Sequence, residues 1–343
     1  MHAKVYIPKS FVQSVVVIMM IAAMLGQASL ASAASSKPSY EYYVVGDPAD
    51  ETGLTTNAGL LLMGGSTDVD DAFRWMIGKS GGGDFVVIRA TGTDAYNPYI
   101  FELGTVNSVE TIITKNRAAA SDPFVVEKIR NAEALFIAGG DQNDYVTHWK
   151  GTPIEDAIHY LVSRHVPIGG TSAGLAIMGE FLFSAANNTV DSETALSDPY
   201  GKRITVERDF LVLPNMGGII TDSHFAARDR MGRLITFLAR IVNDGWASVA
   251  KGVGIDEKTA LAVEPNGDVT VLGIGAAYFL QTPGIPEVCQ VKTALTYRNI
   301  SVYRVSGSAT FNLSTWRGRG GEAYTLSVED GVVISTQAGG GIY

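Results

Sequence analysis

Cysteine is nearly absent from this sequence of 343 residues, and histidine is scarce. The single cysteine, Cys289, cannot form a disulfide within the chain, which excludes both a disulfide-stapled domain and a cysteine-rich zinc site. We therefore expect Cys289 to be a small buried residue with no chemical role. The 5 histidines leave few candidates for a general base.

An excess of positive charge is also missing. The chain has 35 acidic and 26 basic residues, so its formal net charge is −9 and its pI is about 5.1. A surface of that sign repels nucleic acid, and we expect no nucleic-acid partner. With 46% hydrophobic and 18% charged residues, the composition further excludes collagen, a coiled coil and a disordered chain.

Long apolar runs are absent too, apart from one near the start of the sequence. Residues 15–25 are uninterruptedly apolar, with Lys4 and Lys9 before them and Ala31-Ser32-Ala33 after them. This order is typical of a secretory signal peptide, and the run is too short for a comfortable membrane span. We predict a signal peptide over residues 1–33, and hence an exported protein, periplasmic or extracellular, with no membrane span after cleavage. The alternative is an uncleaved membrane anchor.

The remainder of the chain alternates short apolar runs with amphipathic stretches. Residues 34–40 predict a short tether and residues 41–343 a single α/β domain. The pattern predicts strands at 59–65, 84–92, 106–115, 133–140 and 166–174, and helices at 70–80, 122–132 and 152–165. Apolar strands that alternate with helices indicate a mostly parallel sheet covered on both faces. From about residue 262 the pattern becomes β-rich, with a hairpin turn at Asn266-Gly267, and we expect this part to pack on the same domain.

The most informative segment is Gly170-Thr171-Ser172-Ala173-Gly174, which matches G-x-S-x-G directly after an apolar strand. So tight a turn from strand to helix imposes strained backbone angles on the serine and presents its hydroxyl at the carboxyl end of the sheet. The amide of Ala173 would then be one donor of an oxyanion hole. We expect residues 175–183 to continue as a helix. The alternative is an ordinary glycine-rich turn.

A catalytic serine needs a base, and His224 is the best-placed histidine. It follows the apolar stretch 216–220, at the end of a predicted strand, where a base should converge on the nucleophile. The other histidines of the domain are expected in surface, packing or loop positions: His148, His159 and His165. A carboxylate must orient the imidazole, and either Asp256 or Glu257, after a glycine-punctuated strand, could do so on chemistry alone.

Other polar clusters favour structural roles. Asp68, Asp70 and Asp71 lack the spacing of a calcium loop, and we expect them to cap a helix. Gly64-Gly65 follows a strand, but the glycine motif of a dinucleotide-binding loop is not completed. We therefore expect no metal and no organic cofactor.

Four motifs in the same order resemble the cyanophycinase family of serine peptidases, relatives of aspartyl dipeptidase. They are Gly139-Gly140-Asp141-Gln142, the GTSAG turn at 170–174, Asp222-x-His224-Phe225 with the arginines that follow, and GIDEKTA at 254–260. The resemblance covers roughly residues 58–280. It implies a three-layer, flavodoxin-like or class I glutamine-amidotransferase-like α/β fold with the β-rich part as a C-terminal extension.

The resemblance also implies roles for individual residues. Ser172 would be the nucleophile, His224 the base and Glu257 the orienting carboxylate. Gly140 and Asp141 would complete the oxyanion hole with Ala173, and the pocket would include Gln142 and Asp222. The implied substrate is cyanophycin, a poly-aspartate backbone with arginine on each side-chain carboxyl, cleaved to β-aspartyl-arginine dipeptides. The implied partners are thus a peptide or cyanophycin-like polymer, and a second copy in a homodimer.

Two features leave the substrate open. Ser223 stands where the family has glutamine, which favours other aspartyl or isoaspartyl peptides as an alternative substrate. Arg228, Arg230 and Arg233 could form a solvated helix face, the usual meaning of a charge run. Because guanidinium groups pair with carboxylates, and the implied substrate carries them, we expect these arginines to contact substrate or to scaffold the pocket. A third alternative is a binding protein without catalysis on the same scaffold.

Overall fold

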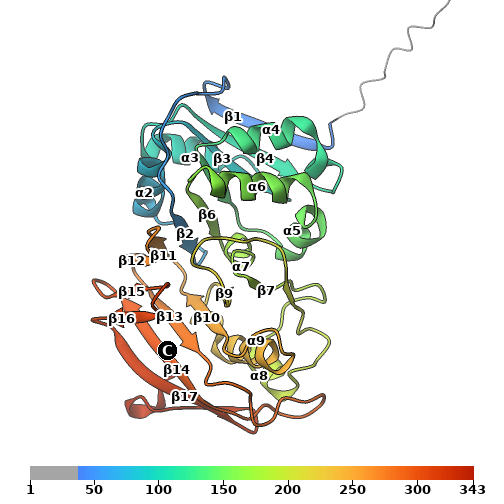
Figure 1. Cartoon of the computed structure of the whole chain (residues 1–343), viewed down its shortest axis with the longest axis vertical. Helices are drawn as coiled ribbons and strands as arrows, with labels where there is room; N and C mark the ends of the chain where they lie inside the picture. Colours follow the sequence, from blue (N-terminus) through green and yellow to red (C-terminus); the bar gives the residue numbers. More distant parts are fainter. Residues whose placement is uncertain (1–37) are drawn as a thin grey trace, which may run out of the picture. The chain divides into compact units, whose positions relative to one another are not determined.

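The computed structural model describes residues 38–343, of which residues 39–343 form one compact unit. The signal peptide predicted over residues 1–33 lies outside the described residues, as does most of the predicted tether. Within the described part, no helix is long and apolar enough to cross a membrane. The chain builds two mixed sheets: in Figure 1 the first extends from the top of the unit into its lower left, and the second lies in the lower half.

The first sheet has a parallel centre of five strands. In spatial order these are β4 (Ser108–Thr114), β3 (Asp84–Arg89), β5 (Ala134–Ile137), β6 (Ile168–Thr171) and β2 (Leu60–Met63). At one edge, β1 (Tyr40–Gly46) pairs antiparallel with β4, so the strand begins where the sequence predicted a tether. Beyond β2 the sheet continues antiparallel through β11 (Thr259–Val263), β12 (Asp268–Gly273), β15 (Thr310–Asn312) and β16 (Arg317–Arg319).

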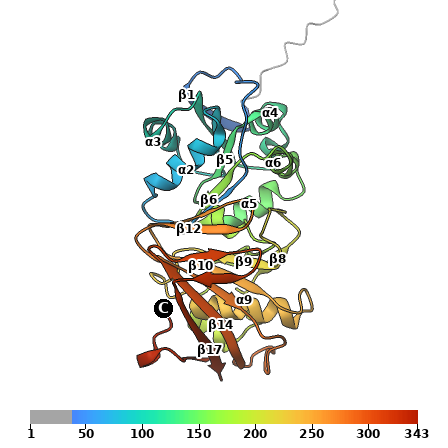
Figure 2. The ribbon, with the colours of Figure 1, turned by 60° about the vertical axis from the view of Figure 1, so that its left-hand side comes forward.

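Helices cover both faces of this parallel centre, because its strands are apolar on both sides. In β2, Leu60 and Leu62 face one core while Leu61 and Met63 face the other, as the period of two in a strand requires. Two helices, α2 (Asp70–Ser80) and α3 (Tyr96–Leu103), cover one face. The other face carries α4 (Pro123–Asn131), α5 (Gln142–Trp149) and α6 (Pro153–Ser163), with the short 3-10 helix η1 (Ala119–Ser121) before them. Figure 2 shows the three layers, and the predicted α/β fold is confirmed.

The second sheet contains most of the remaining strands. Its order is β18 (Val332–Ser335), β17 (Glu322–Glu329), β14 (Tyr297–Ser306), β13 (Ala276–Gln281), β10 (Lys251–Ile255), β9 (Ile219–Asp222), β7 (Phe181–Phe183) and β8 (Val206–Arg208). Only the β10–β9 and β9–β7 pairs are parallel. The helices α8 (Ser192–Ser197) and α9 (Met231–Asn243) share a core with one face, and a last 3-10 turn, η2 (Ala338–Gly340), follows β18. The β-rich part therefore starts well before residue 262.

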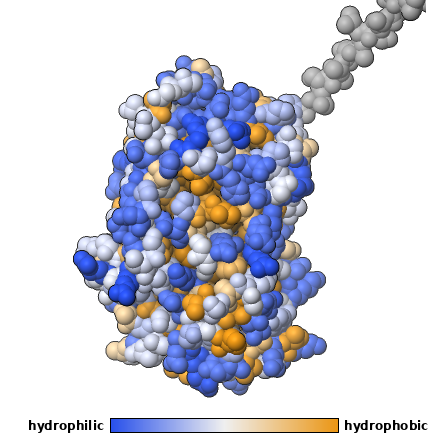
Figure 3. All heavy atoms as spheres, in the orientation of Figure 1, coloured by the Kyte–Doolittle hydropathy of each residue, from blue (hydrophilic) through white to orange (hydrophobic). Residues whose placement is uncertain are grey.

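The predicted hairpin lies within the first sheet, and an aromatic contact packs the second sheet against the first. The predicted hairpin at Asn266-Gly267 joins β11 to β12 in the first sheet. Phe279, on β13 of the second sheet, stacks on Phe311 of β15 in the first, with ring centroids 3.8 Å apart. On the face seen in Figure 3 the surface is mostly hydrophilic with small apolar patches. Most of the large apolar side chains are buried in the interior.

Three local predictions were wrong. The helix after Ser172 is a single turn, α7 (Ala173–Ala176), because the chain leads into β7, which pairs with β9 and β8. His148 lies in α5 and not in a loop, because the Asp141 carboxylate accepts a hydrogen bond from the Asn143 amide and so caps a helix there. None of the aspartates caps α2, whose N-cap is Val69; Asp68 instead accepts from the Tyr96 hydroxyl at 2.9 Å.

Candidate active site

Ser172 lies on the sharp turn between β6 and α7. Its backbone angles, φ 52° and ψ −112°, fall outside the ordinary regions for a residue with a side chain. The turn is held by the Ser172 amide, which donates to the Met63 carbonyl at 3.1 Å, and by close packing at Gly174, where a Cβ would lie 2.1 Å from the Ile137 carbonyl oxygen. The strain predicted from the glycine pattern is therefore present, and it aims the hydroxyl out of the sheet.

The structure brings together three side chains that are far apart in sequence. The Ser172 Oγ lies 2.8 Å from His224 Nε2, and His224 Nδ1 lies 2.7 Å from Glu257 Oε1. His224 follows β9, and its amide donates to the Gly64 carbonyl at 2.8 Å, which ties the histidine to the loop after β2. A hydroxyl, an imidazole and a carboxylate joined in this order are the arrangement of serine hydrolases.

The protonation states favour proton transfer from the serine. His224 is buried, and burial is the main cause that lowers the pKa of its imidazole, although its hydrogen bond to Glu257 acts in the opposite direction. That same bond, as its largest cause, lowers the pKa of the Glu257 carboxyl. Near neutral pH the imidazole is thus neutral, with Nδ1–H donating to an ionised Glu257 and Nε2 free to accept from the Ser172 hydroxyl.

Asp256 and Glu257, which the residues alone could not separate, have different partners. Asp256 accepts hydrogen bonds from two backbone amides, Ala226 to Oδ1 at 2.9 Å and Ala276 to Oδ2 at 3.1 Å. Its carboxylate therefore anchors the segment after His224 and does not reach the imidazole. Glu257, one residue further on, is the carboxylate on the imidazole.

Two backbone amides beside Ser172 are available for an oxyanion. Ala173 is the first residue of α7, so its amide has no acceptor within the helix. Gly140, in the turn before α5, lines the same cavity as Ser172 and Ala173. Among the backbone hydrogen bonds of turns, loops and helix caps in residues 38–343, none is donated by the amide of Gly140 or Ala173. Asp141 lines the cavity as well, with its carboxylate turned to its own helix as a cap.

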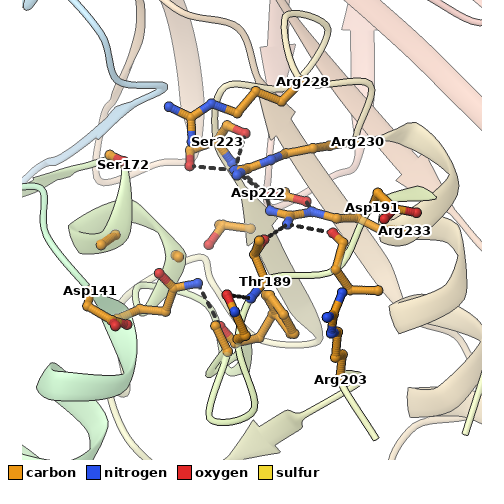
Figure 4. A pocket seen from close by; sticks show the side chains of 18 of the residues that line it. Asp141, Ser172, Thr189, Asp191, Arg203, Asp222, Ser223, Arg228, Arg230 and Arg233 are labelled. Carbon is orange, nitrogen blue, oxygen red and sulfur yellow. Dashed lines mark hydrogen bonds and ion pairs between the residues drawn. The ribbon is translucent and has the colours of Figure 1, made fainter. Parts of the chain in front are cut away.

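Ser172 opens into a cavity of about 470 Å³, drawn in Figure 4. All predicted pocket residues line it: Gln142, Asp222, Ser223, Arg228, Arg230 and Arg233. Gln142 is fixed at one wall, where its side-chain amide donates to the Phe183 carbonyl at 3.4 Å. A cavity of this size suits a small peptide ligand.

The wall beneath Ser223 is an ion-pair network. Arg233 is 3% exposed and donates to both carboxylate oxygens of Asp222, from Nε to Oδ2 at 2.8 Å and from Nη2 to Oδ1. Its remaining Nη1 donates to Thr189 Oγ1 and the Val190 carbonyl. Because every donor group of Arg233 has a partner, this arginine fits the scaffolding alternative. Arg230 is the residue before α9, not within it, and it donates to Asp222 and to the Ser223 carbonyl.

Three other charged residues that line the cavity are exposed and can bind a ligand: Arg228, Arg203 and Asp191. Arg228 is half exposed, and its Nε lies 3.9 Å from Glu257 Oε1. Arg203 and Asp191 also line the cavity, and sequence reasoning missed both. Figure 4 shows Arg203 across the cavity from Arg228. Asp191 could have been found from its position, because its carboxylate caps α8 by accepting from the Thr194 amide at 2.7 Å.

No second centre competes with this site within residues 38–343. No group of three or more histidine, cysteine or acidic side chains there is arranged to hold a metal ion. Two other histidines have local structural contacts: His148 Nε2 lies 3.9 Å from Asp144 Oδ1, and His159 Nε2 accepts from the Val212 amide. Cys289 is buried, as expected, and its burial raises the pKa of the thiol to about 12.

Comparison with known proteins agrees with the motifs. Residues 60–201 match the description "Peptidase family S51". A cyanophycinase of Synechococcus elongatus is 25% identical over 225 residues, and one of Nostoc sp. is 26% identical over 219. These matches cover 64% and 62% of this chain, and 65% and 68% of the two relatives. A solved structure of a peptidase from an acI-B1 Actinobacterium has a TM-score of 0.48 at 16% identity and covers 65% of this chain and 91% of that one.

The fold and the Ser–His–Glu arrangement together define a protein of the serine-hydrolase class. Within that class, the chain is similar to the S51 peptidase family over residues 60–201 and to the cyanophycinases.

Proposed function

We propose that this chain is an exported serine peptidase that hydrolyses the aspartate backbone of cyanophycin to β-aspartyl-arginine dipeptides. One observation carries the proposal: a continuous hydrogen-bonded line from Ser172 through His224 to Glu257 opens into a cavity with charges of both signs. The similarity to proteins named cyanophycinase supports the choice of substrate. Export is proposed from the signal-like residues 1–33.

The reaction is acyl transfer to water. Ser172 Oγ attacks an aspartyl backbone carbonyl while His224 Nε2 takes the hydroxyl proton, and Glu257 holds the imidazole in the tautomer that can accept it. The amides of Gly140 and Ala173 donate to the oxyanion, each being worth about 3 kcal/mol. His224 then protonates the leaving amine, which departs and leaves the acyl-enzyme. In the second half, His224 takes a proton from water as the water attacks the acyl carbonyl, and then returns that proton to Ser172 Oγ as the acid is released.

The charges of the cavity fit a substrate that has both signs. Each β-aspartyl-arginine unit carries a cationic guanidinium and a free carboxylate on its arginine. Arg228 and Arg203 offer guanidinium forks to carboxylates, and the exposed Asp191 offers an acceptor to a guanidinium. A cavity lined by one sign only would disfavour such a unit.

The test is mass spectrometry of the products after the purified protein is incubated with cyanophycin granules. We expect β-aspartyl-arginine dipeptides from the wild type, and turnover lower by about 10⁴-fold or more in Ser172→Ala, which leaves the fold intact. Dipeptide release by Ser172→Ala at the wild-type rate would refute the mechanism. Absence of dipeptides with the wild type would refute the substrate.

Ser223 favours a second candidate substrate. Its small side chain lines the cavity and approaches Arg230, with Oγ 3.3 Å from Nη1, where the family resemblance implies a longer glutamine. The same catalytic residues would then act on other aspartyl or isoaspartyl peptides. A panel of α- and β-aspartyl dipeptides, assayed beside cyanophycin with Ser172→Ala as the blank, separates the two by their kcat/KM values.

A further inference from the structure

The segment that follows His224, the proposed base, packs against Tyr343, the last residue of the sequence. After His224 the backbone runs through Phe225 to Arg230, with the Phe225 amide bonded to the Ile255 carbonyl and the Arg230 amide to the Phe225 carbonyl. Phe225 is fully buried against Gly254, where a Cβ would lie 2.6 Å from its ring. Tyr343 packs edge-on against the Phe225 ring, with centroids 5.8 Å apart and an interplanar angle of 81°.

The Tyr343 hydroxyl also takes the place of a helix cap. The N-cap of α9 is Arg230, whose side chain makes no capping bond. The amide of Met231, the first residue of α9, donates instead to Tyr343 Oη at 3.0 Å. The same hydroxyl donates to Asp229 Oδ1 at 2.8 Å. One phenol thus fixes both the end of the His224 segment and the start of the helix that carries Arg233.

Tyr343 is itself well anchored by the β-rich part of the chain. Its ring lies edge-on to Tyr278 of β13 at 5.8 Å, and Tyr278 in turn contacts Phe225 at 5.3 Å. The backbone next to it is bonded as well, because the Tyr324 hydroxyl of β17 donates to the Ile342 carbonyl at 3.0 Å. A continuous series of contacts thus leads from β17 and β13 through Tyr343 to Phe225, the residue that follows His224.

We propose that Tyr343 is a positioning residue for His224: its ring and hydroxyl hold residues 225–231 so that the imidazole stays on the Ser172 hydroxyl. Tyr343 acts through Phe225 and Met231 and does not touch the cavity. The inference rests on the proposed function, because it assigns the role of base to His224. The part of the chain after residue 262 then contributes to the site through Tyr343 and Tyr278, although it supplies none of the three reacting side chains.

The test uses two variants of Tyr343 and a matched control. Tyr343→Phe removes the hydroxyl and keeps the ring, whereas Tyr343→Ala removes both. Tyr297→Phe is the control, because Tyr297 is a tyrosine of the β-rich part that is more deeply buried than Tyr343, and its hydroxyl bonds to the Gly284 carbonyl, away from residues 225–231. The readout is the rate at which a fluorophosphonate labels Ser172 as a function of pH, which needs no assumption about substrate.

We expect labelling to slow by about 10-fold in Tyr343→Phe and by about 10²-fold in Tyr343→Ala, as for small displacements of a catalytic group. In Tyr343→Ala the acid limb of the labelling rate should also move to higher pH, because a better hydrated imidazole loses part of the burial that lowers its pKa. Tyr297→Phe, at the more deeply buried tyrosine, should lower the melting temperature at least as much as Tyr343→Phe while leaving the labelling rate and its acid limb unchanged.

The outcomes separate this inference from the proposed function. Labelling of folded Tyr343→Phe and Tyr343→Ala at the wild-type rate and pH dependence would overturn the positioning role. Equal loss of labelling in Tyr297→Phe would also overturn it, because a general loss of stability would then account for the effect. Labelling of wild-type Ser172 without cyanophycin hydrolysis would instead refute the substrate and leave the positioning role standing.

Discussion

Gly65 lies against the imidazole of His224 so closely that no other residue fits. A Cβ on Gly65 would be 2.6 Å from both Cε1 and Nε2 of His224 and 3.1 Å from the Ser172 Cβ. The backbone of Gly65 also has φ 96°, which residues with side chains rarely adopt. The glycine pair after β2, which did not complete a dinucleotide motif, therefore makes room for the base beside the nucleophile.

Substitution of this glycine tests that reading. Gly65→Ala should lower kcat by about 10²-fold or more, because the new methyl displaces the imidazole from the Ser172 hydroxyl. Steady-state kinetics with the hydrolysed substrate measures the effect. Gly78→Ala, in α2 with open space around the added methyl, is the control and should keep wild-type kinetics. Wild-type kcat in Gly65→Ala would show that the packing at His224 is looser than the structure describes.

The neighbouring carboxylates Asp256 and Glu257 should behave differently when neutralised. Glu257→Gln should lower kcat by up to about 10⁴-fold with little change in melting temperature, because the imidazole loses the partner that fixes its tautomer. Asp256→Asn should mainly lower the melting temperature, because it disturbs the amide contacts of Ala226 and Ala276. Kinetics and thermal melts of both variants check this. The opposite pattern would make Asp256 the catalytic carboxylate.

The pH dependence of kcat/KM should reflect the neutral imidazole. The pKa of His224 is lowered from its ordinary value of 6.5, so the protonated, inactive form accumulates only at lower pH. Activity should thus fall as pH decreases through an apparent pKa below 6.5. Arg228 contributes to the lowering through its charge, so Arg228→Gln should move the acid limb of the profile to higher pH at low salt. A shift to lower pH would contradict this electrostatic account.

The parallel part of the fold could be predicted because its signals are local. Each apolar strand between β2 and β6 and the helices α2, α4 and α6 show their period within about ten residues, whereas α3 and α5, of 8 residues each, were not predicted. The second sheet could not be predicted as a separate sheet, because its parallel pairs join segments distant in sequence, such as Phe181 with Ile220. The single-turn helix α7 was missed for the same reason, since pairing with β9 decides where it ends.

The residues of the site also differ in whether a local sequence signal identifies them. Ser172 and His224 could be proposed because each follows an apolar strand, although β6 and β9 belong to different sheets and the two residues meet where these sheets adjoin. The choice between Asp256 and Glu257 depends on how one loop points two adjacent side chains, which spacing does not specify. Arg203 and Tyr343 gave no signal, because the cavity wall and the contact behind His224 are formed by tertiary packing alone.

The Asp222–Arg233 pair gives a prediction about stability. Both side chains are nearly fully buried, so Asp222→Asn leaves the Arg233 charge in the interior without its counter-ion. The free energy of unfolding should fall by about 3–5 kcal/mol, measured by urea denaturation.

A pair of the same chemistry on the surface provides the comparison for Asp222→Asn. Asp71 and Arg74 are 2.9 Å apart in α2, and both side chains are at least half exposed. Water solvates Arg74 when Asp71 is neutralised, so Asp71→Asn should change the unfolding free energy by less than about 1 kcal/mol. Equal losses in the two variants would mean that water reaches Arg233. The arginine would then be free to bind substrate, contrary to the scaffolding role that its hydrogen bonds indicate.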